Sequence, residues 1–393
     1  MTALRLPITA AAASTILLSL VAGAHADVSP DAVLDGLKRQ FALQGLDITA
    51  ASAELSGGND VLLSGVTIDV PSADNDIKLE RILLEQVSEA GNGAFVIGRI
   101  AAPAFQNEQD GYTLSLEGAA VEGYYVAGPD ETDPIVKGGV YRAVTVGGVA
   151  VSRGSTPVFT LEGMTATMSP YEPGATMEYD VEVKDFSIDF SQVEDPRTRA
   201  SMTELGYGTM TGRMTADGSW NTDSGDMSMD QAIVLDDAAT LNIDFAIGGY
   251  TPELVAALQQ VNLQMEEQGE EAMGFGRLGL MQQISIDSVT IELVDDSATG
   301  RILDFVAKQQ GTNRESVIAQ AKLALPAALV RLQVPDFAAK VTAAVGTFLD
   351  DPGSLTIAAR PANAVPVVQI MGAAMTSPQS IIGVLGLDAT ANE

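Results

Sequence analysis

Few side chains in this sequence could do acid–base or nucleophilic chemistry near neutral pH. The 393 residues contain no cysteine and one histidine, His25, which lies in the stretch VAGAHADVSP near the N-terminus. Serine hydrolases, cysteine proteases and zinc enzymes use imidazole or thiolate as the base, nucleophile or soft metal ligand. We therefore assign no catalytic, cofactor-binding or metal-ligating residue.

Carboxylates are the one abundant reactive group, with 52 Asp and Glu against 21 Lys and Arg. A pair of carboxylates can divide the roles of acid and base, as in glycosidases. Sugar sites, however, usually stack rings on aromatic side chains, and aromatic residues make up 5% of this chain, with Trp220 the one tryptophan. A carboxylate-pair hydrolase is the third hypothesis, and the composition favours a protein that is not an enzyme.

Three acidic loops could offer oxygen ligands to Ca²⁺. They are residues 73–76, 129–133 and 221–226, with the sequences ADND, PDETD and NTDSGD. Hard cations prefer several oxygen ligands from one loop, and each of these loops offers two or three. Turns select the same residue types. Turn chemistry is the favoured interpretation of all three loops, and calcium binding is the alternative.

Methionine is the other unusual component of the sequence. Flexible thioethers can line a pocket that accepts varied apolar ligands, or they can fill an irregular core, which is the favoured interpretation. Eight methionines fall in the region expected to form a sheet: Met164, Met168, Met177, Met202, Met210, Met214, Met227 and Met229.

The first 26 residues have the features of a secretory signal peptide. Arg5 precedes an apolar stretch from about residue 8 to residue 21, which is short for a transmembrane span. Ala24, His25 and Ala26 form an A-x-A cleavage site, and cleavage after Ala24 is the alternative to cleavage after Ala26. We therefore expect a periplasmic or secreted protein that has no transmembrane anchor after cleavage and has lost its one histidine.

The acidic composition limits the partners of such a protein. The formal net charge is −31. Nucleic acids and anionic lipid headgroups are attracted by basic patches, so we expect neither as a direct partner. Without cysteine, stability in an oxidising compartment must come from packing and strand ladders instead of disulfides.

The hydrophobic period divides the chain into four regions. Residues 1–26 are the signal peptide, and residues 27–250 are a β-rich region that begins with a helix capped by Ser29. Residues 251–350 are mainly helical, and residues 351–393 are a tail of strands and short helices. Within the helical region, Thr312 and Glu315 have the spacing of a capping box, and Pro326 is expected to kink or end the helix that follows.

One eight-residue pattern recurs through the β-rich region and once after it. Its third position is small or Asp, and the alternation of apolar side chains changes phase there, as an extra residue in a strand would cause. The copies start at uneven intervals, which argues against a solenoid. We therefore predict an α+β fold: a long, bent antiparallel sheet (a meander) with C-terminal helices packed on one face. The copies occupy residues 63–70, 116–123, 146–153, 161–168, 183–190 and 286–293.

The repeated strand pattern, the stretch WNTDSGDMSMDQAIVLDDAATLNIDFAIGGYTPE and the tail VPVVQIMGAA resemble uncharacterised exported proteins of proteobacteria. A looser likeness is to the AsmA-like envelope proteins. The resemblance covers the chain from about residue 60. It implies a long curved sheet with an apolar groove, and it implies no catalytic residues.

The leading functional hypothesis is a non-catalytic envelope protein that binds a lipid or another apolar ligand between the sheet and the helices. The alternative is a structural or interaction protein with a closed core, steadied by calcium. Neither hypothesis requires a cofactor, and neither identifies a protein partner.

Overall fold

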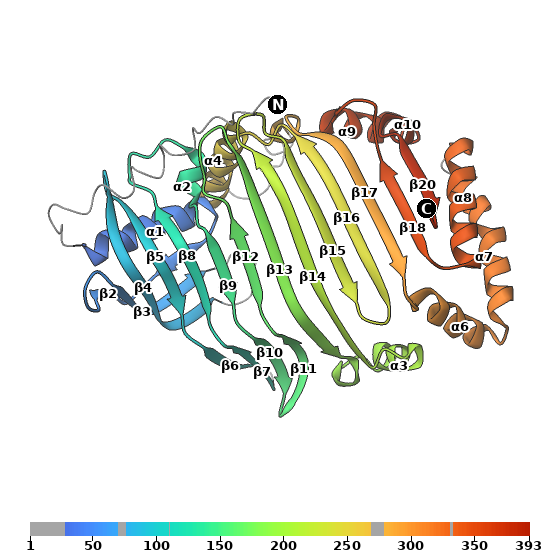
Figure 1. The fold of residues 1–393 in the computed structure, drawn as a ribbon, viewed down its shortest axis with the longest axis horizontal. Helices are drawn as coiled ribbons and strands as arrows, with labels where there is room; N and C mark the ends of the chain where they lie inside the picture. Colours follow the sequence, from blue (N-terminus) through green and yellow to red (C-terminus); the bar gives the residue numbers. More distant parts are fainter. Residues whose placement is uncertain (1–27, 70–75, 110, 269–278, 331–332) are drawn as a thin grey trace, which may run out of the picture.

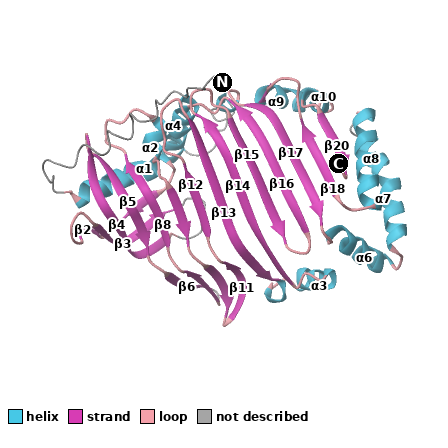
Figure 2. Cartoon of the chain, in the orientation of Figure 1, coloured by secondary structure: helices cyan, strands magenta, loops and turns pink. Residues whose placement is uncertain are grey.

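The computed structural model describes residues 28–69, 76–109, 111–268, 279–330 and 333–393, and it has the predicted α+β fold (Figure 1). Its strands form one antiparallel sheet of 20 strands, with helices around it (Figure 2). The sheet runs through all three regions expected after residue 26, and the predicted signal peptide, residues 1–26, lies outside the described residues.

The described elements have the following bounds. The helices are α1 Pro30–Leu43, α2 Pro134–Gly138, the 3-10 helix η1 Phe190–Gln192, α3 Pro196–Leu205, α4 Pro252–Gln268, α6 Ala298–Gln310, α7 Arg314–Leu329, α8 Pro335–Asp350, α9 Val367–Thr376 and α10 Ser380–Val384. The strands of the first half are β1 Asp47–Thr49, β2 Ser52–Leu55, β3 Val61–Asp69, β4 Ile77–Gly91, β5 Ala94–Ala102, β6 Phe105–Gln109, β7 Tyr112–Leu116, β8 Ala119–Val126, β9 Ala143–Val146 and β10 Val149–Arg153. Those of the second half are β11 Thr156–Leu161, β12 Met164–Met168, β13 Thr176–Asp189, β14 Thr209–Asn221, β15 Met227–Leu235, β16 Ala239–Gly248, β17 Ser285–Asp295, β18 Ser354–Ala359, β19 Val365–Pro366 and β20 Leu387–Ala391.

The sheet is a meander of long strands, several of which are split by a bend. The pairs β5–β6, β7–β8, β9–β10 and β11–β12 each form one long strand, because both halves pair with the matching halves of the next strand. β13 is long enough to pair with both β12 and β11. The strands β13 to β18 then follow one another in chain order, and β20 forms the last pair.

The predicted phase changes lie at these bends. Gly118 separates β7 from β8, Gly148 separates β9 from β10, and Gly163 separates β11 from β12. The hydrogen bonds continue across the line of bends, since the Gly147 amide donates to the Gly118 carbonyl at 2.8 Å and the Lys184 amide donates to the Gly163 carbonyl at 2.9 Å. The bends are therefore aligned across neighbouring strands and turn the sheet as a whole.

Three more copies of the pattern also mark irregular backbone. Gly65 has a φ of +59° in β3, opposite the break between β1 and β2. β13 shifts register between Val183 and Phe186. In the last copy the extra residue is Asp287, one position before the predicted Ser288.

One of the two helix N-termini predicted from capping residues is confirmed, and the other is wrong. The side chain of Ser29 accepts a hydrogen bond from the amide of Ala32, as predicted for α1. The predicted capping box of α7 is wrong, because Asn313 is the N-cap and its side chain accepts from the Ser316 amide at 3.0 Å. Asn is as good a cap as Thr and stands one residue closer to the helix. Pro326 lies inside α7, which continues to Leu329.

The helices lie mainly around the margins of the sheet. α1 packs on the N-terminal strands, where its buried side chains join those of β1, β3, β4, β5 and β8 in the main hydrophobic core. α8 packs against β18 and β20 at the C-terminal edge. Figure 1 shows α2, α4, α9 and α10 at one end of the strands and α3 and α6 at the other. A helix thus covers one face of the sheet over the N-terminal strands, and elsewhere helices lie mainly along the margins of the sheet.

The bend at Gly163 yields a stability prediction. A Cβ atom at this position would lie 3.0 Å from the carbonyl oxygen of Val146, and the backbone has a φ of +152°. Gly163→Ala should therefore lower the free energy of unfolding by about 2 to 3 kcal/mol, from strain and contact together. Urea denaturation measures this change.

Gly154→Ala is the matched control. Gly154 also has a positive φ, of +60°, but a Cβ there would meet nothing within 4 Å. This substitution should lower the free energy of unfolding by only about 1 kcal/mol, because alanine is strained in this left-handed backbone conformation. An equal decrease in the free energy of unfolding for the two variants would show that the close approach of the strands at Gly163 does not contribute to the effect.

Candidate functional site

The sheet has an apolar face, on the side where α1 packs, and we call it the inner face. Residues that stand opposite each other on neighbouring strands point to the same side of a sheet. One row of such residues crosses the sheet from β3 to β20 and contains a single polar member, Gln231. The row is Val61, Leu84, Ile100, Val121, Val144, Ala166, Val181, Ala216, Gln231, Ile243, Ile291, Ile357 and Ala389.

Burial changes along this row. Val61 and Leu84 are 0% exposed, because α1 covers them. Ile291 and Ile357 are directly paired with each other and are 44% and 48% exposed. Part of the inner face is therefore open to solvent, although its residues are of the same apolar type as those under α1.

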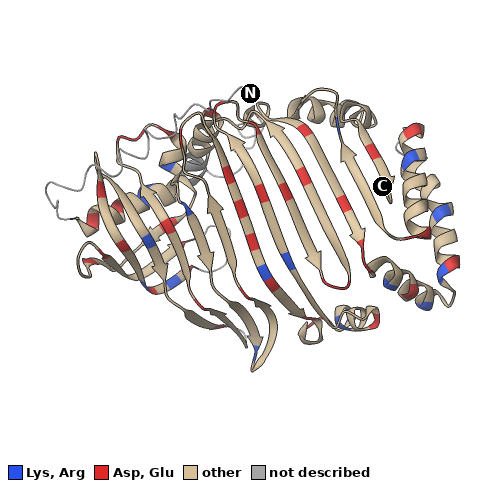
Figure 3. Ribbon diagram, viewed as in Figure 1, with Lys and Arg blue, Asp and Glu red and all other residues tan. Residues whose placement is uncertain are grey.

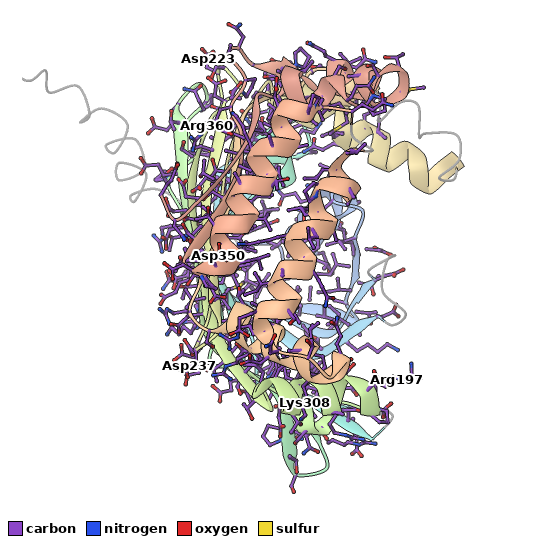
Figure 4. The ribbon with its side chains drawn as sticks, turned by 90° about the vertical axis from the view of Figure 1, so that its right-hand side faces the viewer. Arg197, Asp223, Asp237, Lys308, Asp350 and Arg360 are labelled. Atoms are coloured by element: carbon purple, nitrogen blue, oxygen red, sulfur yellow. The ribbon has the colours of Figure 1, made fainter. Side chains whose placement is uncertain are left out.

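The open part extends over the middle strands. Among the described residues, no side chain of β15 is buried, and in β16 only Gly248 is buried. In Figure 4 the sheet is seen from its C-terminal edge, with α7 and α8 in front and α3 and α4 projecting to the same side at the two ends. Helices therefore border the face without burying its middle strands.

Seven of the eight methionines of the predicted sheet region lie on this face. The strand pairing places Met164, Met168, Met177, Met210, Met214, Met227 and Met229 on the inner face, and Met202 lies in α3. Six of these seven are half-buried, and Met177 is buried. The thioethers therefore line a partly open apolar surface in addition to packing against their neighbours.

The opposite face, the outer face, carries a row of carboxylates. Asp180, Asp217, Asp230 and Asp244 stand directly opposite one another on β13, β14, β15 and β16. Figure 3 shows acidic residues on each of these neighbouring strands. Among the ion pairs of the described residues, none involves these four aspartates. Directly opposed like charges destabilise a sheet, so this row opposes folding at neutral pH.

Neighbouring carboxylates affect the protonation of Asp244, the last member of the row. Burial, a hydrogen bond with Asp230 and the charges of Asp230 and Glu292 raise the pKa of Asp244 above the usual range. The pKa of Asp287, on the neighbouring strand β17, is raised by burial and by the charge of Asp226. A shallow depression of about 550 Å³ lies over the first three aspartates of the row. The sequence alone does not show that the four aspartates of the row are paired, because they come from four different strands.

The loops considered as alternative calcium sites use their oxygen atoms in hydrogen bonds, where the structure describes them. In residues 129–133, the Glu131 carboxylate accepts from two backbone amides, and Asp133 caps α2 and accepts from the Tyr171 hydroxyl at 2.6 Å. In residues 221–226, Asn221 accepts from two amides and Ser224 donates to Asp226. Residues 73–75 lie outside the described residues. Within the described chain, no group of three or more His, Cys, Asp or Glu is arranged to hold a metal ion.

The carboxylate row gives a pH-dependent prediction. A carboxyl group whose pKa is raised in the folded state stabilises the fold fully below the ordinary aspartate pKa of about 3.9. This contribution is lost as the pH rises through the pKa of the folded state. At pH 7 the ionised row is therefore unfavourable, and Asp244→Asn should raise the free energy of unfolding by about 0.5 to 1 kcal/mol. This increase in the free energy of unfolding should disappear at about pH 3, where the Asp244 carboxyl group is mostly protonated in both the folded and the unfolded protein.

Urea denaturation at several pH values tests this, with Asp223→Asn as the control. Asp223 lies in the turn between β14 and β15, so its substitution removes the same unit charge outside the row. If the free energy of unfolding rose equally in both variants, the effect would come from the change in net charge alone and not from the row.

One comparison with known proteins gave a match, which covers the part of the chain from β15 to β20. A family model described as "Uncharacterized protein" matches residues 232–392, which include the most exposed residues of the inner-face row, Ile291 and Ile357. No curated protein matches the chain.

In the segments that the structure describes, no helix combines the length and the apolarity needed to cross a membrane.

Proposed function

We propose that this protein holds a lipid or another apolar ligand against the open inner face and does so without catalysis. The observation that carries the proposal is the exposure of Ile291 and Ile357, at 44% and 48%, near the C-terminal end of an apolar row. Large contiguous apolar surfaces are rare on proteins that function alone in water, and they mark binding sites.

The chemistry of the face favours a flexible apolar ligand. In the row described above, Gln231 is the one polar member, and its amide nitrogen donates to the thioether of Met214 at 3.0 Å. The surrounding methionines are unbranched and adapt to different shapes, so the surface can accept acyl chains of different lengths. Contact with such a chain would remove apolar side chains from water, at about 25 cal/mol per Å².

The expected cellular location supports the same proposal. The signal peptide predicted over residues 1–26 would deliver the protein to the periplasm or beyond, where membranes are a source of lipid. The resemblance to exported proteobacterial proteins, and the looser likeness to AsmA-like envelope proteins, are also consistent with a lipid ligand. The acidic outer face would face water and keep the ligand-bearing protein soluble.

The first experiment is to purify the protein without detergent, extract it with organic solvent and analyse the extract by mass spectrometry. We expect a lipid to co-purify at a reproducible ratio. The delipidated protein should then bind a fluorescent fatty-acid probe. Absence of both the lipid and probe binding would refute the proposal.

The second experiment locates the site. Ile291→Asn combined with Ile357→Asn should lower the affinity for the fatty-acid probe about 10-fold, because two exposed apolar contacts are replaced by groups that prefer water. Fluorescence titration measures the affinity, and urea denaturation verifies that the variant is folded.

Val294→Asn is the matched control for this variant. Val294 lies on the same strand as Ile291 and is also exposed, at 38%, but strand alternation places it on the outer face. Its substitution should leave the affinity unchanged. If it weakened binding as much as the inner-face variant does, the ligand would not lie on the inner face.

A further inference from the structure

One end of the molecule carries a long segment without charge. Residues 361–387, which include β19, α9 and α10, contain no Asp, Glu, Lys, Arg or His, in a chain whose net charge is −31. The segment also contains no aromatic residue. We call it the uncharged end. Figure 1 shows α9 and α10 lying across the ends of the C-terminal strands.

Large apolar side chains are exposed there. Met375 and Val368, both in α9, are 86% and 43% exposed. Next to this end, in Figure 1 and Figure 4, lie the C-terminal end of α7 and the N-terminal end of α8, and Val330, directly after α7, is 71% exposed. A cleft of about 490 Å³ between these two helices is lined by Val330, two prolines, three alanines and a threonine. Two independent parts of the chain therefore present apolar surface at the same end.

The composition distinguishes between kinds of partner. Binding energy at protein interfaces comes mainly from Trp, Tyr and Arg, inside a polar rim, and the uncharged end has none of these residues. The hydrocarbon boundary of a bilayer accepts aliphatic side chains and methionine and excludes charged groups. The strongly acidic remainder of the chain would be repelled by anionic headgroups, so the complementary surface is zwitterionic.

We propose that the uncharged end docks on a zwitterionic lipid membrane through α9. Docking is shallow, since α9 has 10 residues and lies across the strand ends. The strands then extend away from the membrane, and the inner face begins next to the lipid surface. The inference deepens the proposed function, because it names the membrane as the source of the ligand and rests on that function for the ligand's nature.

The test is co-sedimentation of the exported form of the protein, its N-terminus checked by mass spectrometry, with phosphatidylcholine vesicles. We expect partition that persists in high salt and weakens when phosphatidylglycerol is added. The double variant Val368→Asp with Met375→Asp should lower the partition coefficient at least ~10-fold, because two inserted apolar groups are replaced by carboxylates.

Leu55→Asp is the matched control. Leu55 is 51% exposed in β2, far from the uncharged end in the sheet, so its substitution should leave partition unchanged. Failure of the wild-type protein to sediment, or equal partition of the double variant, would overturn the proposal. So would a wild-type dimer in vesicle-free solution that the double variant converts to a monomer, because the surface would then join two copies of the chain.

The two proposals can fail separately. The double variant at the uncharged end should still bind the fatty-acid probe in solution, and the inner-face variant Ile291→Asn with Ile357→Asn should still sediment with vesicles. Loss of vesicle binding by the inner-face variant would place the membrane contact on the inner face and overturn the docking surface proposed here.

Discussion

The structure depends on the register of one continuous antiparallel ladder. Because opposed residues point to the same side, the register decides which side chains meet across the sheet, and it sorts them into an apolar inner face and an acidic outer face. A slip of one residue at any strand would exchange the two faces there. The phase changes at the bends are part of this constraint, since each aligned bend lets a long strand turn while its apolar side chains stay on the inner face.

The same ladder explains how a large chain without disulfides can be held together. Each long strand pairs with the next over most of its length, and the hydrogen bonds continue through the bends. The main core is compact only where α1 closes the inner face over the N-terminal strands. Further along, the strands are held by their neighbours in the sheet while one face stays open. An uncovered apolar face beside a covered one is the feature on which the proposed ligand site rests.

The charge distribution complements this arrangement. The acidic residues of the middle strands gather on the outer face, where Asp180, Asp217, Asp230 and Asp244 face water at the cost of mutual repulsion. Such a face disfavours association through that side and keeps an apolar protein dispersed. The inner face and the uncharged end are left as the surfaces suited to apolar partners.

The sequence by itself determined the α+β class, the bends at Gly118, Gly148 and Gly163, the N-cap of α1 at Ser29, and the scarcity of imidazole and thiol groups, because these depend on local spacing and residue type. It could not show the row of aspartates or the open inner face. Alternation tells which residues share a side of one strand, but not which strand lies beside it or whether a helix covers that side. Those features arise from hydrogen bonds and packing between residues distant in the chain, and only the tertiary structure decided them.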